Sequence, residues 1–74
     1  MDITWQKQID TTTETTWLGW IAGRCEFRVG YCRHGSSASR PIGLERFDDS
    51  GFPRFVGAYA TVAGAKAAAK RATA

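Results

Sequence analysis

The chain has 74 residues, 43% of them hydrophobic, and its 10 basic and 7 acidic residues give a formal net charge of +3. A chain of this length forms one domain with one small core, which leaves no room for the second lobe that closes many enzyme clefts. No apolar run approaches the roughly 20 residues that span a bilayer, and the first ten residues lack the pattern of a signal peptide, so the sequence predicts a cytoplasmic protein with no membrane segment.

The first 14 residues are predicted to form a strand or an arm laid on the core. Ile3, Trp5 and Ile9 alternate loosely with polar residues, as they would on a strand with one buried face. The polar, β-branched run that follows predicts a solvated connection or the frayed start of the next strand.

Residues 15–34 carry the clearest strand signals and predict a hairpin with Gly23 in its turn. The first half is apolar on both faces, and the second half alternates between apolar and polar residues. A two-residue period in the second half predicts one face with Cys25, Phe27 and Val29 and another with Arg24 and Arg28.

The two cysteines, Cys25 and Cys32, are seven positions apart in this predicted strand. At about 3.3 Å per residue they lie far beyond disulfide reach and on opposite faces. Free thiols are typical of a reducing compartment, although pairing between two chains stays open.

Residues 35–41 are rich in Gly and Ser and predict a polar loop, and residues 42–60 predict a second hairpin. Asp48, Asp49 and Gly51 lie at its centre. Asp and Gly both tolerate the backbone angles of a tight turn, so these two acids are assigned to the turn and not to acid-base chemistry.

Residues 61–73 predict a helix. Thr61 is a suitable N-cap, and Val62, Ala65, Ala69 and Ala72 share one stripe at helical spacing. Alanines let a helix approach a sheet closely, so the Trp, Phe and Tyr side chains of the strands are expected to fill the gap between them. The predicted fold is α+β: a three- to five-stranded antiparallel sheet with one C-terminal helix packed on one face.

The sequence offers little for catalysis. Cys32 and His34 could form a nucleophile and base, but no orienting acid or oxyanion site accompanies them. Ligand spacing suitable for a metal is missing, as is a phosphate-binding glycine loop. A non-enzymatic protein without metal or cofactor is therefore expected.

Binding is the better supported class, because arginines outnumber lysines outside the helix and suit phosphates and carboxylates alike. Trp17 and Trp20 should face opposite sides of their strand, which leaves one of them for a second layer or a target. The alternative is an ordinary solvated sheet face with Glu26 neutralising a neighbour. The predicted binding residues are Trp20, Arg24, Arg28, Arg33, Arg54, Lys66 and Lys70.

The segment from Arg54 to Thr61, followed by Ala65, Ala68 and Ala69, resembles the last strand and helix of AP2-type and integrase-arm-type DNA-binding domains. Those domains bind duplex DNA through the exposed face of a three-stranded sheet. The resemblance implies that Arg24, Arg28 and Arg54 face DNA. In size and style the chain is also similar to small phage and prophage accessory proteins that bind host proteins, such as anti-CRISPR inhibitors.

The expected function is a binding module that inhibits a host protein or protein–nucleic acid complex. Direct binding of duplex DNA is the first alternative and a structural homo-oligomer the second. A net charge of +3 with Glu26 in the sheet is small for unaided duplex affinity, which favours the protein partner.

Overall fold

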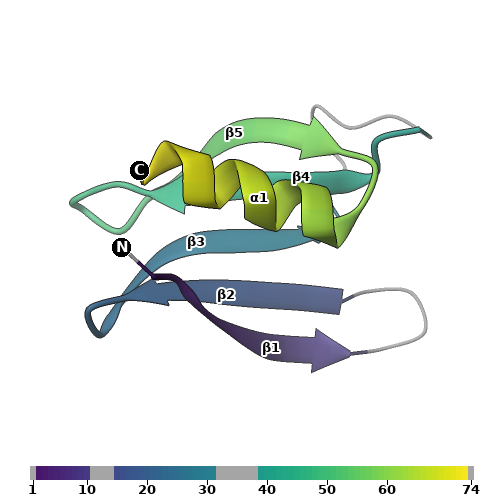
Figure 1. The fold of residues 1–74 in the computed structure, drawn as a ribbon. Helices are drawn as coiled ribbons and strands as arrows, with labels where there is room; N and C mark the ends of the chain where they lie inside the picture. The colour runs from purple at the N-terminus through teal and green to yellow at the C-terminus, as the bar shows by residue number, and fades with distance from the viewer. Residues whose placement is uncertain (1, 11–14, 32–38, 74) are drawn as a thin grey trace.

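The structure is a computed structural model that describes residues 2–10, 15–31 and 39–73. Five strands form one antiparallel sheet in the order β1-β2-β3-β4-β5, and one helix lies across the β3–β5 part of the sheet (Figure 1). The elements are β1 (Thr4–Asp10), β2 (Thr15–Ile21), β3 (Arg24–Tyr31), β4 (Ile42–Phe47), β5 (Pro53–Tyr59) and α1 (Val62–Ala72).

The predicted α+β class, both hairpins and the C-terminal helix are confirmed, and the N-terminal segment is a strand. The sheet has five strands, the upper limit of the three to five that the sequence predicted. Among the described residues, no helix combines the length and hydropathy needed to cross a membrane. Cys32, Arg33, His34 and most of the loop at 35–41 lie outside the described residues.

Helix α1 begins at a side-chain cap and packs through alanine. The Thr61 hydroxyl accepts a hydrogen bond from the Gly64 amide at 3.0 Å, as the sequence predicted. Ala65, Ala68 and Ala69 are buried against the sheet. Ala72, which the helical period placed on the buried stripe, is exposed, so the stripe runs through Ala68 instead.

The core fills the space between these alanines and the central strands. Phe27 and Val29 from β3 and Ile42 and Leu44 from β4 are its large buried side chains. Aromatic residues were expected to supply most of this bulk, yet within the described core Phe27 is the one buried aromatic side chain. Val29, Ile42 and Leu44 supply the other large buried side chains, and Trp5, Trp17 and Tyr59 pack against this core while partly buried.

The β2–β3 hairpin closes with two residues of positive φ, Ala22 at 52° and Gly23 at 79°. This pair of left-handed residues matches the right-handed twist of the strands that it joins. Gly23 adopts such angles freely, whereas Ala22 is an uncommon residue there.

A β-bulge at Glu26 changes which side chains of β3 share a face of the sheet. Phe27 pairs with Gly19 and Cys25 pairs with Trp20, so Glu26 has no partner in β2. Directly paired residues share a face, and one extra residue reverses the alternation. Cys25 therefore lies on the face opposite Phe27. The prediction that they share a face is wrong.

Candidate functional site

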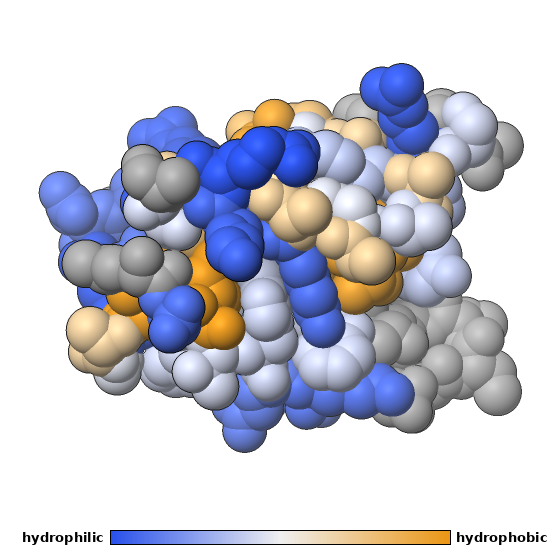
Figure 2. Space-filling model, viewed as in Figure 1, coloured by the Kyte–Doolittle hydropathy of each residue, from blue (hydrophilic) through white to orange (hydrophobic). Residues whose placement is uncertain are grey.

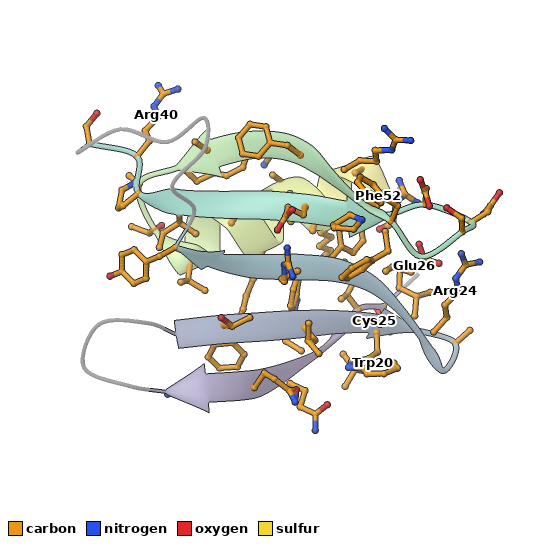
Figure 3. All side chains as sticks on the ribbon, turned by 180° about the vertical axis from the view of Figure 1, so that it is seen from behind. Trp20, Arg24, Cys25, Glu26, Arg40 and Phe52 are labelled. Atoms are coloured by element: carbon orange, nitrogen blue, oxygen red, sulfur yellow. The ribbon has the colours of Figure 1, made fainter. Side chains whose placement is uncertain are left out.

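The helix covers one face of the sheet, and the opposite face is the first candidate surface. We call it the open face; Figure 3 views it directly, with Trp20 and Cys25 near one end. Strand register assigns its members, because paired residues point the same way. The open face comprises Thr4, Gln6, Leu18, Trp20, Cys25, Arg28, Gly30, Gly43, Glu45, Phe47, Pro53, Phe55 and Ala58.

Arg28 lies on this face, as predicted, and forms an ion pair with its cross-strand partner. Its Nε and Nη2 donate hydrogen bonds to Glu45 Oε1 at 2.8 and 2.6 Å. The guanidinium carbon also lies 6.0 Å from the centre of the Phe47 ring. The charge of Arg28 is thus neutralised by a neighbour, which weakens any attraction for phosphate.

Large apolar side chains lie on β2, β4 and β5 of the open face, whereas β1 contributes the polar residues Thr4 and Gln6. Phe55 is 49% exposed, and Leu18, Trp20 and Phe47 are partly exposed. Val56, the bulged residue of β5, is 46% exposed at the adjoining edge of the sheet. The apolar surface therefore continues from the open face onto the edge strand.

Cys25 is a free thiol beside Trp20. Burial raises the pKa of this thiol. A thiol with a raised pKa is protonated at neutral pH and a poor nucleophile. The predicted Cys32 and His34 pair lies outside the described residues, and within those residues no three His, Cys, Asp or Glu side chains gather as a metal site.

Arg24 and Arg54 do not join Arg28. The bulge pairs Arg24 with Ile21, whose side chain packs on the core, and Arg54 pairs with Arg46. The predicted common face for Arg24 and Arg28 is therefore wrong. The reason is again Glu26, which shifts the register by one residue.

Both displaced arginines contact the β4–β5 turn. Arg24 Nη2 donates to the Asp48 carbonyl at 3.2 Å, and Arg54 Nε donates to the Asp48 carboxylate at 3.2 Å. Hydrogen bonds from the Ser50 side chain, from the Phe52 amide and from Arg54 lower the pKa of Asp48 to about 2. Arg24 also pairs with the Asp49 carboxylate at 3.6 Å, so acids of the turn engage both arginines within the chain itself.

The two predicted lysines lie elsewhere, on the side of α1 that faces β1. Lys66 Nζ lies 3.5 Å from the centre of the Trp17 ring and 5.5 Å from that of Trp5. Burial lowers the pKa of Lys66. Lys70, one turn further along α1, lines a groove between α1 and β1 together with Lys66 and Trp5. Seen from the helix side, hydrophobic surface is broken into small areas by hydrophilic side chains (Figure 2).

The structure thus divides the predicted binding set among three places. Trp20 and Arg28 lie on the open face, Arg24 and Arg54 at the β4–β5 turn, and Lys66 and Lys70 beside β1; Arg33 lies outside the described residues. Sequence reasoning missed Phe47, Phe55 and Trp5 as surface-forming residues. For the first two, the available signal in the sequence was the presence of aromatic residues on both sides of the Asp48 turn.

Comparisons of this chain with protein-family models, with curated protein sequences and with solved structures found no match. The resemblances to sheet-and-helix DNA-binding domains and to small phage proteins therefore stay predictions.

Proposed function

We propose that this chain is a non-enzymatic protein-binding module whose open face is its main contact surface. One observation carries the proposal. The open face presents large apolar side chains around a single arginine, and that arginine is already paired with Glu45. Apolar side chains with few unpaired charges are typical of the centre of a protein interface.

The size of the surface indicates that the partner also contacts the edge strand. Strands about 4.8 Å apart and seven residues long at about 3.3 Å per residue give a five-stranded face of roughly 450 Å². A standard interface uses about 800 Å² of each partner. Val56 and Phe52, which are 46% and 59% exposed, extend the apolar surface beyond the face itself.

Duplex DNA is the less favoured partner. A sheet that binds DNA needs several unpaired basic side chains on one face, since each phosphate contact requires one. Arg28 is the basic residue that the register assigns to the described open face, and it has an acidic partner. Arg24 and Arg54, the other two residues implied by the resemblance, lie away from it.

The more specific prediction, a phage or mobile-element protein that inhibits a host complex, rests on the short chain and on the lack of a catalytic motif in its sequence. The open face supports the wider class, binding to a protein. A homo-oligomer that pairs edge strands or stacks tryptophans is the remaining alternative, and light scattering of the purified chain measures it directly.

The test is affinity purification from the expressing cell with matched variants. Phe55→Ser removes an exposed aromatic ring from the open face. Tyr31→Ser removes one that is 59% exposed on the helix side, where its strand partner Ile42 is buried in the core. The protein recovered with the wild-type chain should be lost with Phe55→Ser and retained with Tyr31→Ser.

Fluorescence anisotropy with duplex DNA distinguishes the alternative. Protein binding through an apolar face predicts little binding to DNA at about 50 mM salt, and no effect of Arg28→Ala. Micromolar binding that weakens steeply by about 200 mM salt and with Arg28→Ala would instead assign the sheet to DNA.

A further inference from the structure

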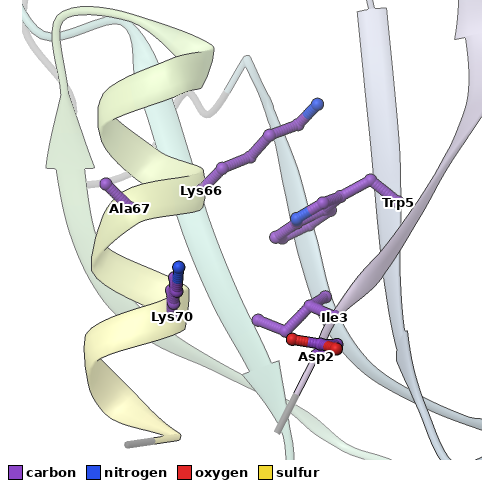
Figure 4. A pocket seen from close by; sticks show the side chains of 6 residues that line it. All are labelled: Asp2, Ile3, Trp5, Lys66, Ala67 and Lys70. Atoms are coloured by element: carbon purple, nitrogen blue, oxygen red, sulfur yellow. The ribbon is translucent and has the colours of Figure 1, made fainter.

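A second surface lies on the helix side of the sheet, where a groove of about 360 Å³ separates α1 from β1. It is lined by Asp2, Ile3, Trp5, Lys66, Ala67 and Lys70. Figure 4 shows Lys66 reaching from the helix over Trp5, with Ile3 and Asp2 on the strand side. The helix packs on β3, β4 and β5, so β1 is left beside it and not beneath it.

The floor of the groove depends on a glycine, Gly19, whose lack of a side chain leaves room for Trp5 and Ile3. Trp5 pairs with Gly19 in the neighbouring strand, and a Cβ atom at position 19 would lie 2.8 Å from Cζ3 of Trp5. It would also lie 3.0 Å from Cγ2 of Ile3. The indole and the isoleucine therefore rest directly on the backbone of β2. This gives the groove an apolar floor of fixed position.

Two lysines, Lys66 and Lys70, make the helix side of the groove positive. Lys66 and Lys70 are four residues apart and so lie on the same face of α1, where Cβ atoms at this spacing are about 5–6 Å apart. Within the described residues, neither forms an ion pair with a carboxylate, whereas the arginines of β3, β4 and β5 all do. Lys66 instead rests against two indole rings, where its ammonium is partly removed from water.

We propose that this groove binds an acidic peptide segment of a partner protein. A carboxylate of the segment pairs with Lys66 and Lys70, and an adjacent apolar side chain lies on Trp5 and Ile3. Charge complementarity carries the assignment, since two unpaired ammonium groups flank an apolar floor.

Asp2 favours a peptide over a nucleic acid. Its carboxylate can accept a hydrogen bond from a peptide N–H, but it repels a phosphate. A peptide can present its acids to the lysines and a neutral stretch to Asp2, whereas a nucleic acid is charged along its whole length. The groove lies on the opposite side of the sheet from the open face, so the proposal does not depend on what the open face binds.

The tryptophans provide the readout. Trp5 and Trp17 contact Lys66, and Trp20 lies on the open face. Trp20 can be replaced at low cost, because its buried indole N–H has no hydrogen-bond partner in the described part of the chain. In a Trp20→Phe protein, all remaining tryptophan fluorescence reports on the groove and its surroundings.

The probe is the blocked peptide acetyl-Ser-Phe-Glu-Glu-Ser-amide, titrated into the Trp20→Phe protein at about 50 mM salt. We expect a saturable change in tryptophan fluorescence. A charge-assisted contact contributes enough that Lys70→Gln should weaken binding by about tenfold or more. Arg71→Gln is the matched control: it removes the same charge from the neighbouring residue, which does not line the groove, and should leave affinity within about twofold.

Three results would overturn the proposal. The first is equal binding of a peptide with glutamine in place of both glutamates. The second is an equal loss in Lys70→Gln and Arg71→Gln, which would indicate attraction by net charge alone. The third is saturation by single-stranded oligothymidylate at lower concentrations than by the peptide, which would assign the groove to nucleic acid.

Discussion

At the scale of single residues, Asp48 organises the β4–β5 turn. Its Oδ1 accepts hydrogen bonds from the Ser50 amide, the Ser50 hydroxyl and the Phe52 amide at 3.0, 2.7 and 2.9 Å. Its Oδ2 accepts one from Arg54 at 3.2 Å. The ionised carboxylate is the better acceptor for all four donors, which is why its pKa is low.

This low pKa predicts an acid-dependent loss of stability. The pKa of Asp48 is about 2 in the folded chain, against an ordinary value of 3.8. A lowered pKa stabilises the folded state above the unfolded value, and this contribution is lost as the pH falls from about 4 towards 2. The melting temperature of the wild-type chain should fall over this range more steeply than that of Asp48→Asn.

The Asp48→Asn chain has no carboxylate to titrate at this position, so it should start with a lower melting temperature near pH 6. The melting temperatures of the two proteins should then converge as the pH falls towards 2. Parallel pH profiles for the two proteins would show that the turn does not depend on the charge of Asp48.

At the scale of elements, the alanines of α1 set the distance between helix and sheet. Ala65 and Ala69 are fully buried over β3, β4 and β5. Space this close-packed does not accept added side-chain atoms without displacement of the helix. Ala63, in the first turn of the same helix, is exposed.

A pair of matched substitutions tests this close approach. Ala69→Leu should destabilise the fold by about 1–3 kcal/mol through overpacking. Ala63→Leu adds the same atoms at an exposed position and should change stability by less than about 0.5 kcal/mol. Urea unfolding followed by circular dichroism measures both values, and an Ala69→Leu chain as stable as Ala63→Leu would mean that the helix does not pack as described.

The features that could be predicted from the sequence are local. Asp48 with Gly51 indicated the second turn, and Thr61 before strong helix formers indicated the start of α1, because each effect acts within a few residues. The sheet class followed from alternation in β3. Each of these inferences needs only neighbours in the chain.

The features that could not be predicted depend on pairing between elements. The bulge at Glu26 exists only with respect to β2, and it moves Arg24 and Cys25 to the faces opposite those expected. The groove between α1 and β1 could not be predicted from the sequence for the same reason. Trp5 meets Lys66 only after β1 pairs with Gly19 of β2 and the helix lies beside it.

At the scale of the whole molecule, the two sides of the sheet differ in charge and in chemistry. The open face carries large apolar side chains around a neutralised ion pair. The helix side carries Lys66 and Lys70, which form no ion pair within the described residues, beside an indole floor. The arginines that seemed to suit DNA are engaged by acids of the chain itself. A protein partner on the open face accounts for this distribution better than a polyanion does.

The most direct test of that account is site-specific photo-crosslinking in the expressing cell. A benzoylphenylalanine at position 55 should form a discrete crosslinked product with a second protein, because Phe55 lies exposed on the open face. The same group at position 63, on the exposed part of the helix, should form none. Products of equal yield at both positions, or a product at position 55 that contains only a second copy of this chain, would contradict the proposed protein-binding face.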